Sequence, residues 1–403
     1  MRYISTRGQT DPMNFTQALV SGLAPDGGLL VPDALPTLPS DWATWSYREA
    51  MVGSLEMFGA RGVVDLVDRA ASRFSHPDIA PIVEVDDRLV LELFWGPTLS
   101  FKDHALQVVA RLLDREVERG TILGATSGDT GSAAIEAVRG SDRLDIVVLF
   151  PEGRVSEFQR RQMTTVPDLN VKAVAIRGTF DDCQALVKEA FSRHELLAVN
   201  SINWARVAAQ VGYYIHAAAR IGQQFDVVVP TGNFGNVYSC WIGKQIGLPI
   251  ETITIANNAN HGLADLVESG SMTRAGVVAT VAPSMDIQVP SNLERFSADP
   301  THEFRSGWSD DDQIRKTIAR VHEDHAYLLD THTATAWRAG ESTRSDRPQL
   351  VVATAHPAKF PEAVTAAIGQ APQPPAGYPD LFDLPESTIV INNDPSELDP
   401  LIR

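Results

Sequence analysis

Short apolar runs alternate with longer amphipathic segments along most of this chain, and this alternation limits the possible folds more than any other feature. Residues 146–150 are continuously apolar, as expected of a strand that is buried on both faces of a sheet. Strands are predicted at residues 89–94, 121–125, 144–150, 171–176, 225–229, 250–256 and 350–353, and helices at residues 104–118, 132–139, 182–193, 204–221, 237–246 and 311–329. Such alternation indicates βαβ units, so we predict an α/β fold with ligands bound beyond the carboxyl ends of open sheets.

The domain organisation follows from length and from where the alternation begins. A length of 403 residues with 44% hydrophobic residues is typical of a globular protein of two or three domains. Residues 1–90 lack a clear strand–helix rhythm, so we expect a small N-terminal domain there. A smaller α/β lobe is then expected at residues 91–205 and a larger one at residues 206–403.

Charge and cysteine content exclude several classes of partner and site. The net charge of −17 argues against nucleic acid as a partner, because an acidic surface repels the phosphate backbone. Only Cys183 and Cys240 are present, which excludes a disulfide framework and a cysteine-rich zinc site. His322 and His325 lie one helical turn apart but lack a third ligand, so no metal site is expected. Because the sequence shows neither a signal peptide nor an apolar run of membrane-spanning length, we expect a cytoplasmic protein without a membrane partner.

One candidate anion site is the loop at residues 230–236, which lies between a buried strand and a helix. Gly232 and Gly235 allow a tight turn and a close approach of the backbone to a ligand. Free N–H groups at the start of the following helix suit a phosphate. The spacing is neither the dinucleotide fingerprint nor a Walker A loop, so a phosphate site without nucleotide machinery is indicated. The alternative is an ordinary strand–helix turn.

A second candidate anion site lies at residues 126–131, again between a strand and a helix. Four of these six residues carry side-chain oxygens and the other two are glycines, which suits a carboxylate or a phosphate. The alternative is a simple helix cap made by Asp129 or Thr130, and the two roles are compatible.

Lys102 is the candidate for covalent chemistry. It lies between Phe101 and a predicted helix start, where partial desolvation and the positive helix end both lower the pKa of the ammonium group. A neutral amine is what Schiff-base chemistry requires. A lysine at a helix start is usually solvated, so the assignment depends on the two anion sites that accompany it. Thr354, at the end of a buried strand, adds a neutral hydroxyl at the edge where ligands bind. Together these features suggest pyridoxal 5'-phosphate as the cofactor.

The sequence also resembles the threonine synthase family over nearly its whole length. The resemblance is carried, in the same order, by residues 3–8, 22–29, 93–103, 126–131, 178–184, 200–206, 232–236 and 354–360. It implies a pyridoxal-phosphate enzyme of fold type II, similar to the tryptophan synthase β subunit, with two open α/β lobes and a small N-terminal domain. One departure is Trp95, where the family usually has histidine before Gly-Pro-Thr, and we expect it to change a local contact only.

The resemblance also implies an activity, a carbon–oxygen lyase reaction that converts O-phospho-L-homoserine and water to L-threonine and phosphate. It implies that Lys102 bonds to the cofactor aldehyde and then moves the substrate protons, and that Thr354 faces the pyridine nitrogen. The implied phosphate-binding residues are Gly232, Asn233, Phe234, Gly235 and Asn236, and the implied substrate-binding residues are Thr126, Ser127, Asp129, Thr130 and Arg206.

Several points stay open at this level. Arg206, Arg160 and Lys359 are candidates for binding the substrate phosphate, although each is otherwise a solvated surface charge. Another fold-type-II reaction, such as threonine dehydration, and a non-catalytic cofactor-binding homologue are the alternatives. Either a monomer or a homodimer is expected.

Overall fold

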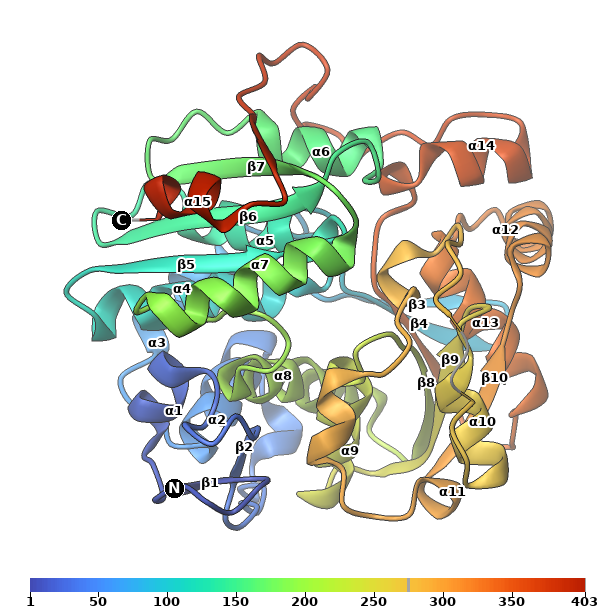
Figure 1. Cartoon of the computed structure of the whole chain (residues 1–403). Helices are drawn as coiled ribbons and strands as arrows, with labels where there is room; N and C mark the ends of the chain where they lie inside the picture. Colours follow the sequence, from blue (N-terminus) through green and yellow to red (C-terminus); the bar gives the residue numbers. More distant parts are fainter. Residues whose placement is uncertain (274–275, 403) are drawn as a thin grey trace.

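The computed structural model describes residues 1–273 and 276–402. Two β-sheets form the cores of two α/β lobes, and a small N-terminal domain packs beside them (Figure 1). This confirms the predicted α/β fold with two open lobes and a small N-terminal domain.

The larger sheet places its most apolar strands at its centre. Within the described residues its strand order is β10 (Phe304–Trp308), β9 (Ile250–Asn257), β8 (Phe225–Pro230), β11 (Gln349–Ala353), β4 (Arg88–Glu92) and β3 (Ile82–Val85). All neighbours are parallel except β3, which runs antiparallel to β4. Val351 of the central strand lies opposite Val90 and Val228, and all three are fully buried. Burial on both faces explains why these strands are continuously apolar.

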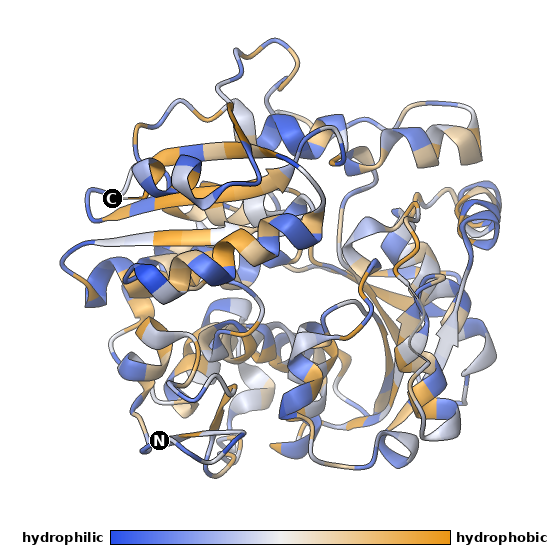
Figure 2. Cartoon of the chain, in the orientation of Figure 1, coloured by the Kyte–Doolittle hydropathy of each residue, from blue (hydrophilic) through white to orange (hydrophobic). Residues whose placement is uncertain are grey.

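The smaller sheet is entirely parallel over the described residues. Its strand order is β12 (Ile389–Asn392), β7 (Val171–Arg177), β6 (Leu144–Pro151) and β5 (Gly120–Ala125). Helix α7 (Phe180–Arg193) packs on one face and α5 (Asp129–Val138) on the other, so the apolar run of β6 is covered on both sides (Figure 1). Figure 2 shows the same pattern as apolar strands enclosed by helices with polar outer faces.

The N-terminal domain combines a two-stranded antiparallel sheet with short helices. Strand β1 (Tyr3–Ser5) pairs with β2 (Leu30–Pro32), and α2 (Tyr47–Met57) packs against α8 (Trp204–Ile221), which connects the lobes. The remaining helices are α1 (Phe15–Ser21), α3 (Val64–Ala71), α4 (Lys102–Glu116), α6 (Glu157–Thr164), α9 (Gly235–Gln245), α10 (Gly262–Ser269), α11 (Pro300–Glu303), α12 (Asp311–His325), α13 (Thr331–Ser342), α14 (Pro361–Ile368) and α15 (Pro395–Leu398). In the part of the chain that is described, no helix is both long and apolar enough to cross a membrane.

Three strands lie outside the units to which the predicted boundaries assign them. Strand β3 lies wholly, and β4 mostly, within residues 1–90, which were expected to form the N-terminal domain, yet both belong to the larger sheet. Strand β12 falls within residues 206–403, which were expected to form the larger lobe, yet it pairs with β7 of the smaller sheet. These differences have one physical cause, because β4 and β12 pair with strands far away in the sequence and no local pattern specifies the partner.

One helix is shorter than its pattern predicts. Helix α12 begins at Asp311 as expected but ends at His325, not at residue 329. Ala326 follows in the left-handed conformation, with φ 54°, and its N–H donates to the carbonyl of His322. This left-handed cap ends the helix although the apolar pattern continues.

Candidate active site

A cavity of about 510 Å³ lies where the loops after several strands of both sheets meet. The loop after β5 contributes residues 126–130, the loop after β8 contributes residues 231–236, and Thr354 follows β11. The structure brings together in this cavity all the residues that the sequence analysis assigned to cofactor and substrate: Lys102, Thr126, Ser127, Asp129, Thr130, Arg206, Gly232, Asn233, Phe234, Gly235, Asn236 and Thr354.

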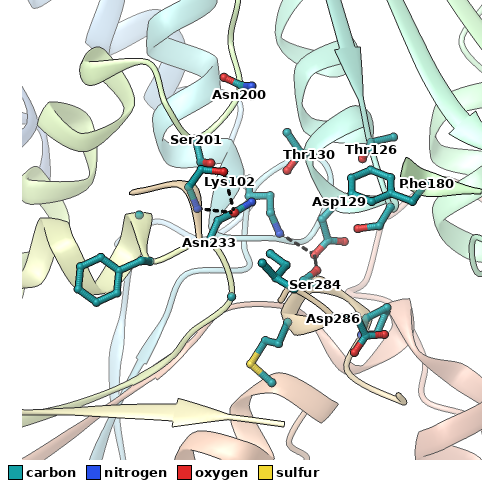
Figure 3. A pocket seen from close by; sticks show the side chains of 18 of the residues that line it. Lys102, Thr126, Asp129, Thr130, Phe180, Asn200, Ser201, Asn233, Ser284 and Asp286 are labelled. Atoms are coloured by element: carbon teal, nitrogen blue, oxygen red, sulfur yellow. Dashed lines mark hydrogen bonds and ion pairs between the residues drawn. The ribbon is translucent and has the colours of Figure 1, made fainter. Parts of the chain in front are cut away.

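Lys102 is the first residue of α4 and its amine points into the cavity (Figure 3). Its side chain is only 10% exposed, and Nζ lies 3.0 Å from Oδ2 of Asp129 and 4.9 Å from the centre of the Phe101 ring. Burial lowers the pKa of Lys102, and this effect outweighs the opposing attraction of the Asp129 carboxylate. A lysine in this environment supplies a neutral amine more readily than a solvated one.

Both carboxylate oxygens of Asp129 have partners in or beside the cavity. Oδ2 accepts hydrogen bonds from Lys102 and from the Ser284 hydroxyl at 3.1 Å, as the dashed lines in Figure 3 show. Oδ1 accepts one from Gln159 at 2.8 Å and lies 3.1 Å from Nζ of Lys359. Although burial disfavours its charge, the two ammonium groups hold the pKa of Asp129 well below its usual range. Asp129 is therefore a carboxylate that faces the reactive amine.

The loop at residues 231–236 turns through a backbone conformation that side chains rarely adopt. Phe234 has φ 64°, and its ring is buried in edge-on contact with Phe296 and Phe304, which anchors the turn. A Cβ at Gly232 would lie 2.4 Å from the carbonyl oxygen of Ser284, so only glycine fits there. Helix α9 starts at Gly235 without a side-chain cap, which leaves its N-terminal N–H groups directed at the cavity edge.

Asn236 provides the test of whether a phosphate fits this loop. The hydroxyls of Tyr213 and Tyr214 donate to Oδ1 of Asn236 at 2.6 and 2.7 Å, which fixes the orientation of the amide. Nδ2 of Asn236 is buried and has no hydrogen-bond partner. An unpartnered buried donor beside an uncapped helix N-terminus suits a phosphate group, so the residues present fit pyridoxal 5'-phosphate.

The loop at residues 126–131 is held by one of its own hydroxyls. Oγ1 of Thr126 accepts hydrogen bonds from the N–H groups of Gly128 and Gly131, both at 2.9 Å. Asp129 and Thr130 lie inside helix α5, whose cap residue is Gly128 and makes no side-chain cap bond. The alternative in which Asp129 or Thr130 only caps the helix is therefore wrong, because both residues belong to the first turn.

Of the three cationic candidates for binding the substrate phosphate, only one lines the cavity. Arg206 lines the cavity and is 3% exposed, and its Nε has no partner. Burial lowers the pKa of Arg206 to about 10. Arg160 instead pairs with Glu386, and Lys359 is enclosed beside Asp129, so neither lines the cavity. Arg154, which sequence reasoning did not select, does line it.

Sequence reasoning also missed residues from the larger lobe. Ser284 reaches Asp129, and its own N–H donates to Nε2 of His332 at 3.2 Å. No local motif marks either residue, since the contact joins segments far apart in sequence.

Trp95 lines a different cavity, of about 730 Å³. Its indole N–H donates to Glu92, which is the kind of local contact that we expected its substitution to change. Within residues 1–273 and 276–402, no three His, Cys, Asp or Glu side chains are grouped so as to hold a metal ion.

Comparison with protein families gives matches along almost the whole chain. A family described as pyridoxal-phosphate dependent enzymes matches residues 82–355. The threonine synthase N-terminal family matches residues 2–63, and the threonine synthase C-terminal family matches residues 333–402. Threonine synthase of Pseudomonas aeruginosa is 40% identical to this chain over 98% of the chain and 96% of the relative.

Solved structures give the same result at the level of the fold. A structure of threonine synthase from Brucella melitensis with bound pyridoxal phosphate superposes with a TM-score of 0.94 and 41% identity, and covers 100% of this chain and 98% of that chain. Threonine synthase from yeast superposes with a TM-score of 0.91 and 32% identity, and covers 99% and 97% of the two chains. The predicted fold type II of pyridoxal-phosphate enzymes is thereby confirmed.

Proposed function

The chain belongs to the threonine synthase family, and from this we propose that it converts O-phospho-L-homoserine and water to L-threonine and phosphate. The reaction breaks the carbon–oxygen bond to phosphate, so we place the protein among the carbon–oxygen lyases. One observation carries the proposal: the buried amine of Lys102 and the unpartnered amide of Asn236 lie in the same cavity.

Pyridoxal 5'-phosphate is the cofactor of this family member, and three parts of the cavity are suited to hold it. The N–H groups at the start of α9 and Nδ2 of Asn236 would bind its phosphate. The Lys102 amine would bond to its aldehyde, and the Thr354 hydroxyl would face its ring nitrogen. When bound, the cofactor withdraws electrons from the Cα atom of an amino-acid substrate and so makes the Cα proton acidic.

Lys102 is the group that we propose moves protons. Its amine must be free of its proton to accept the Cα proton of the substrate, and burial of Nζ favours this state. Oδ2 of Asp129 accepts a hydrogen bond from Nζ, so it would orient the amine and stabilise the ammonium formed after proton uptake. After passing that proton on, the amine would take a proton from Cβ, and loss of this proton expels phosphate from Cγ and leaves a carbon–carbon double bond. The ammonium would then return the proton to Cγ, and water would add at Cβ to give threonine.

The substrate carries two anionic groups, and the cavity offers a separate environment for each. Ser127 and Thr130 line the cavity at the start of α5, which suits the α-carboxylate because the N-terminal end of a helix attracts anions. Arg206 has an unpartnered Nε and lines the same cavity, so we propose that it binds the phosphate of the substrate. Two anion sites in one cavity would discriminate against amino acids that lack a phosphate.

Product analysis of the purified protein with pyridoxal 5'-phosphate tests this function. We expect O-phospho-L-homoserine to yield equal amounts of inorganic phosphate and threonine, and L-threonine to yield little ketoacid. A threonine dehydratase would give the reverse pattern. Ketoacid formation from threonine, or the absence of phosphate release from phosphohomoserine, would contradict the proposal.

A further inference from the structure

Lys359 is a buried charge outside the cavity. It ends the short 3-10 helix at Pro357–Lys359, and its side chain is fully buried. Nζ has a partner for each of its three protons: it donates to the carbonyl of Thr98 at 2.6 Å and to Oε1 of Gln162 at 2.7 Å, and it lies 3.1 Å from Oδ1 of Asp129. A lysine is seldom buried so completely, and here every N–H of the side chain has a partner.

The partners of Lys359 are themselves fixed. Nε2 of Gln162 donates to the Thr98 carbonyl at 3.0 Å and to the Tyr378 hydroxyl at 2.8 Å. Gln162 therefore cannot rotate without losing three contacts. The ammonium of Lys359 is thus held in place beside Oδ1 of Asp129, whereas Ser284 donates to Oδ2.

Asp129 divides its two oxygens between two lysines. Oδ1 faces Lys359 and Oδ2 faces Lys102. With Lys359 present, the Asp129 carboxylate interacts with two ammonium groups, so it stabilises the charged form of Lys102 less than it would alone. Without Lys359, the carboxylate would pair with Lys102 alone.

Asp103 and His356 also lie near Lys359, and of these two only Asp103 is charged at neutral pH. The titratable groups facing it are Asp129, Lys102, Asp103 and His356. Burial raises the pKa of Asp103 to about 6, and burial lowers the pKa of His356 to about 4, so at neutral pH Asp103 is an anion and His356 is neutral. Helix α6 presents glutamines to this region, and its charged residues make their ion pairs with one another or with Glu386: Glu157, Arg160 and Arg161.

We propose that Lys359 is a positioning residue, which fixes the Asp129 carboxylate toward Lys102 and, by its charge, favours the neutral amine of Lys102. The inference rests on the proposed role of Lys102 as the proton-transferring group. Lys359 does not line the cavity, so it acts on Lys102 through the orientation of Asp129 and through its own positive charge.

The test is the pKa of the Lys102 amine in the cofactor-free, full-length protein. The rate at which an amine-reactive reagent labels the peptide that carries Lys102 is followed from pH 6 to pH 11 by mass spectrometry. In Lys359→Met we expect this pKa to rise by roughly one unit or more, because a nearby positive charge is removed while Asp129 remains. Lys316→Met removes the same charge from the exposed face of α12 and should leave the pKa of Lys102 unchanged.

Two further variants keep the test decisive. Lys359→Gln replaces Lys359→Met in the labelling experiment if the methionine variant does not fold, because an amide can still donate to the Thr98 carbonyl. Lys359→Arg retains the charge and should restore a pKa close to that of the wild type. A wild-type pKa in the neutral variants, an arginine variant shifted as far as they are, or failure of both neutral variants to fold would overturn the proposal, the last because it would assign Lys359 a purely structural role.

Kinetics of the holoenzyme give an independent readout. A rise of one unit in the pKa of Lys102 reduces its neutral fraction about tenfold at pH 7. In the neutral variants kcat should therefore fall about tenfold at pH 7, with its acid limb displaced to higher pH, while KM changes less than twofold. If O-phospho-L-homoserine proves not to be a substrate, the proposed function fails but the labelling experiment still decides the role of Lys359.

Discussion

Replacement of Asn236 by aspartate tests the proposed phosphate site without changing the shape of the side chain. The Tyr213 and Tyr214 hydroxyls donate to Oδ1 of Asn236, and burial raises the pKa of both phenols well above the usual value, so they remain donors to a carboxylate. What changes is the other atom of the amide. The unpartnered Nδ2 donor becomes an anionic acceptor inside a loop that we propose binds a phosphate.

The expected loss of affinity is large. Two unit charges about 4 Å apart repel by about 4 kcal/mol at an effective dielectric constant of about 20. Since every 1.4 kcal/mol is tenfold in affinity, repulsion alone weakens binding about a thousandfold. Loss of a hydrogen bond to a charged group adds about 1.5 to 3 kcal/mol. We therefore expect the Kd for pyridoxal 5'-phosphate to rise by at least three orders of magnitude in Asn236→Asp.

The Kd is measured by titrating the cofactor-free protein with pyridoxal 5'-phosphate and recording absorbance. Asn14→Asp is the matched control, because Asn14 caps helix α1, where aspartate is an equally good cap. It adds the same charge to the chain outside the cavity and should leave the Kd unchanged. A Kd within a few-fold of the wild-type value in Asn236→Asp, with the protein folded, would show that the phosphate is bound elsewhere.

Three further predictions follow, two from the same geometry and one from a buried histidine. Lys102→Ala should abolish threonine formation, and borohydride reduction of the wild-type holoprotein should attach the cofactor to the peptide containing Lys102; label on another peptide would refute the assignment. Arg206→Met should raise KM for O-phospho-L-homoserine about ten- to a hundredfold with little change in kcat, because a charged hydrogen bond to the substrate is lost; an unchanged KM would exclude Arg206 from phosphate binding. Burial lowers the pKa of His216 from 6.5 to about 4, so the unfolded chain takes up the proton first, and the stability contributed by neutral His216 is complete above pH 6.5 and is lost as pH falls toward 4. At pH 5 the loss amounts to about 2 kcal/mol, so His216→Phe should reduce the fall in unfolding free energy between pH 7 and pH 5 by about this amount in urea titrations; an unchanged fall would argue against it.

Local pattern was sufficient to predict the strands that are buried on both faces. Each of the seven predicted strands is present within about two residues, and six of them lie inside a sheet, where a continuous apolar run leaves few alternatives. The exception is β5, an edge strand of the smaller sheet whose residues 121–123 are nonetheless buried. The strands that were missed lie at edges or in the N-terminal domain. Strands β10 (Phe304–Trp308) and β12 (Ile389–Asn392) are both edge strands. Each has exposed positions, so its sequence lacks a continuous apolar run.

The site residues that could be predicted from sequence are likewise those that lie next to a buried strand. Residues that follow a buried strand could be selected from sequence, because the strand fixes where its carboxyl end lies and glycine or hydroxyl residues there have a clear use. Thr126, Gly232 and Thr354 were found in this way, and all three line the cavity. Ser284 and His332 follow no such strand, and their positions depend on how distant segments fold back over the cavity.

The environment of Lys102 shows why chemistry is harder to predict than placement. Sequence alone indicated a lowered pKa from the helix start and from Phe101, and the structure gives the same direction with burial as the largest cause. The second influence, the carboxylate of Asp129, opposes this effect, and its strength depends on how much of it is committed to Lys359. Asp129 thus divides its charge between two lysines that are distant in the sequence. Lys102 lies 27 positions before Asp129, and Lys359 lies 230 positions after it. No local pattern contains this division, because the protonation state of a buried lysine is set by all the charges that the fold places around it.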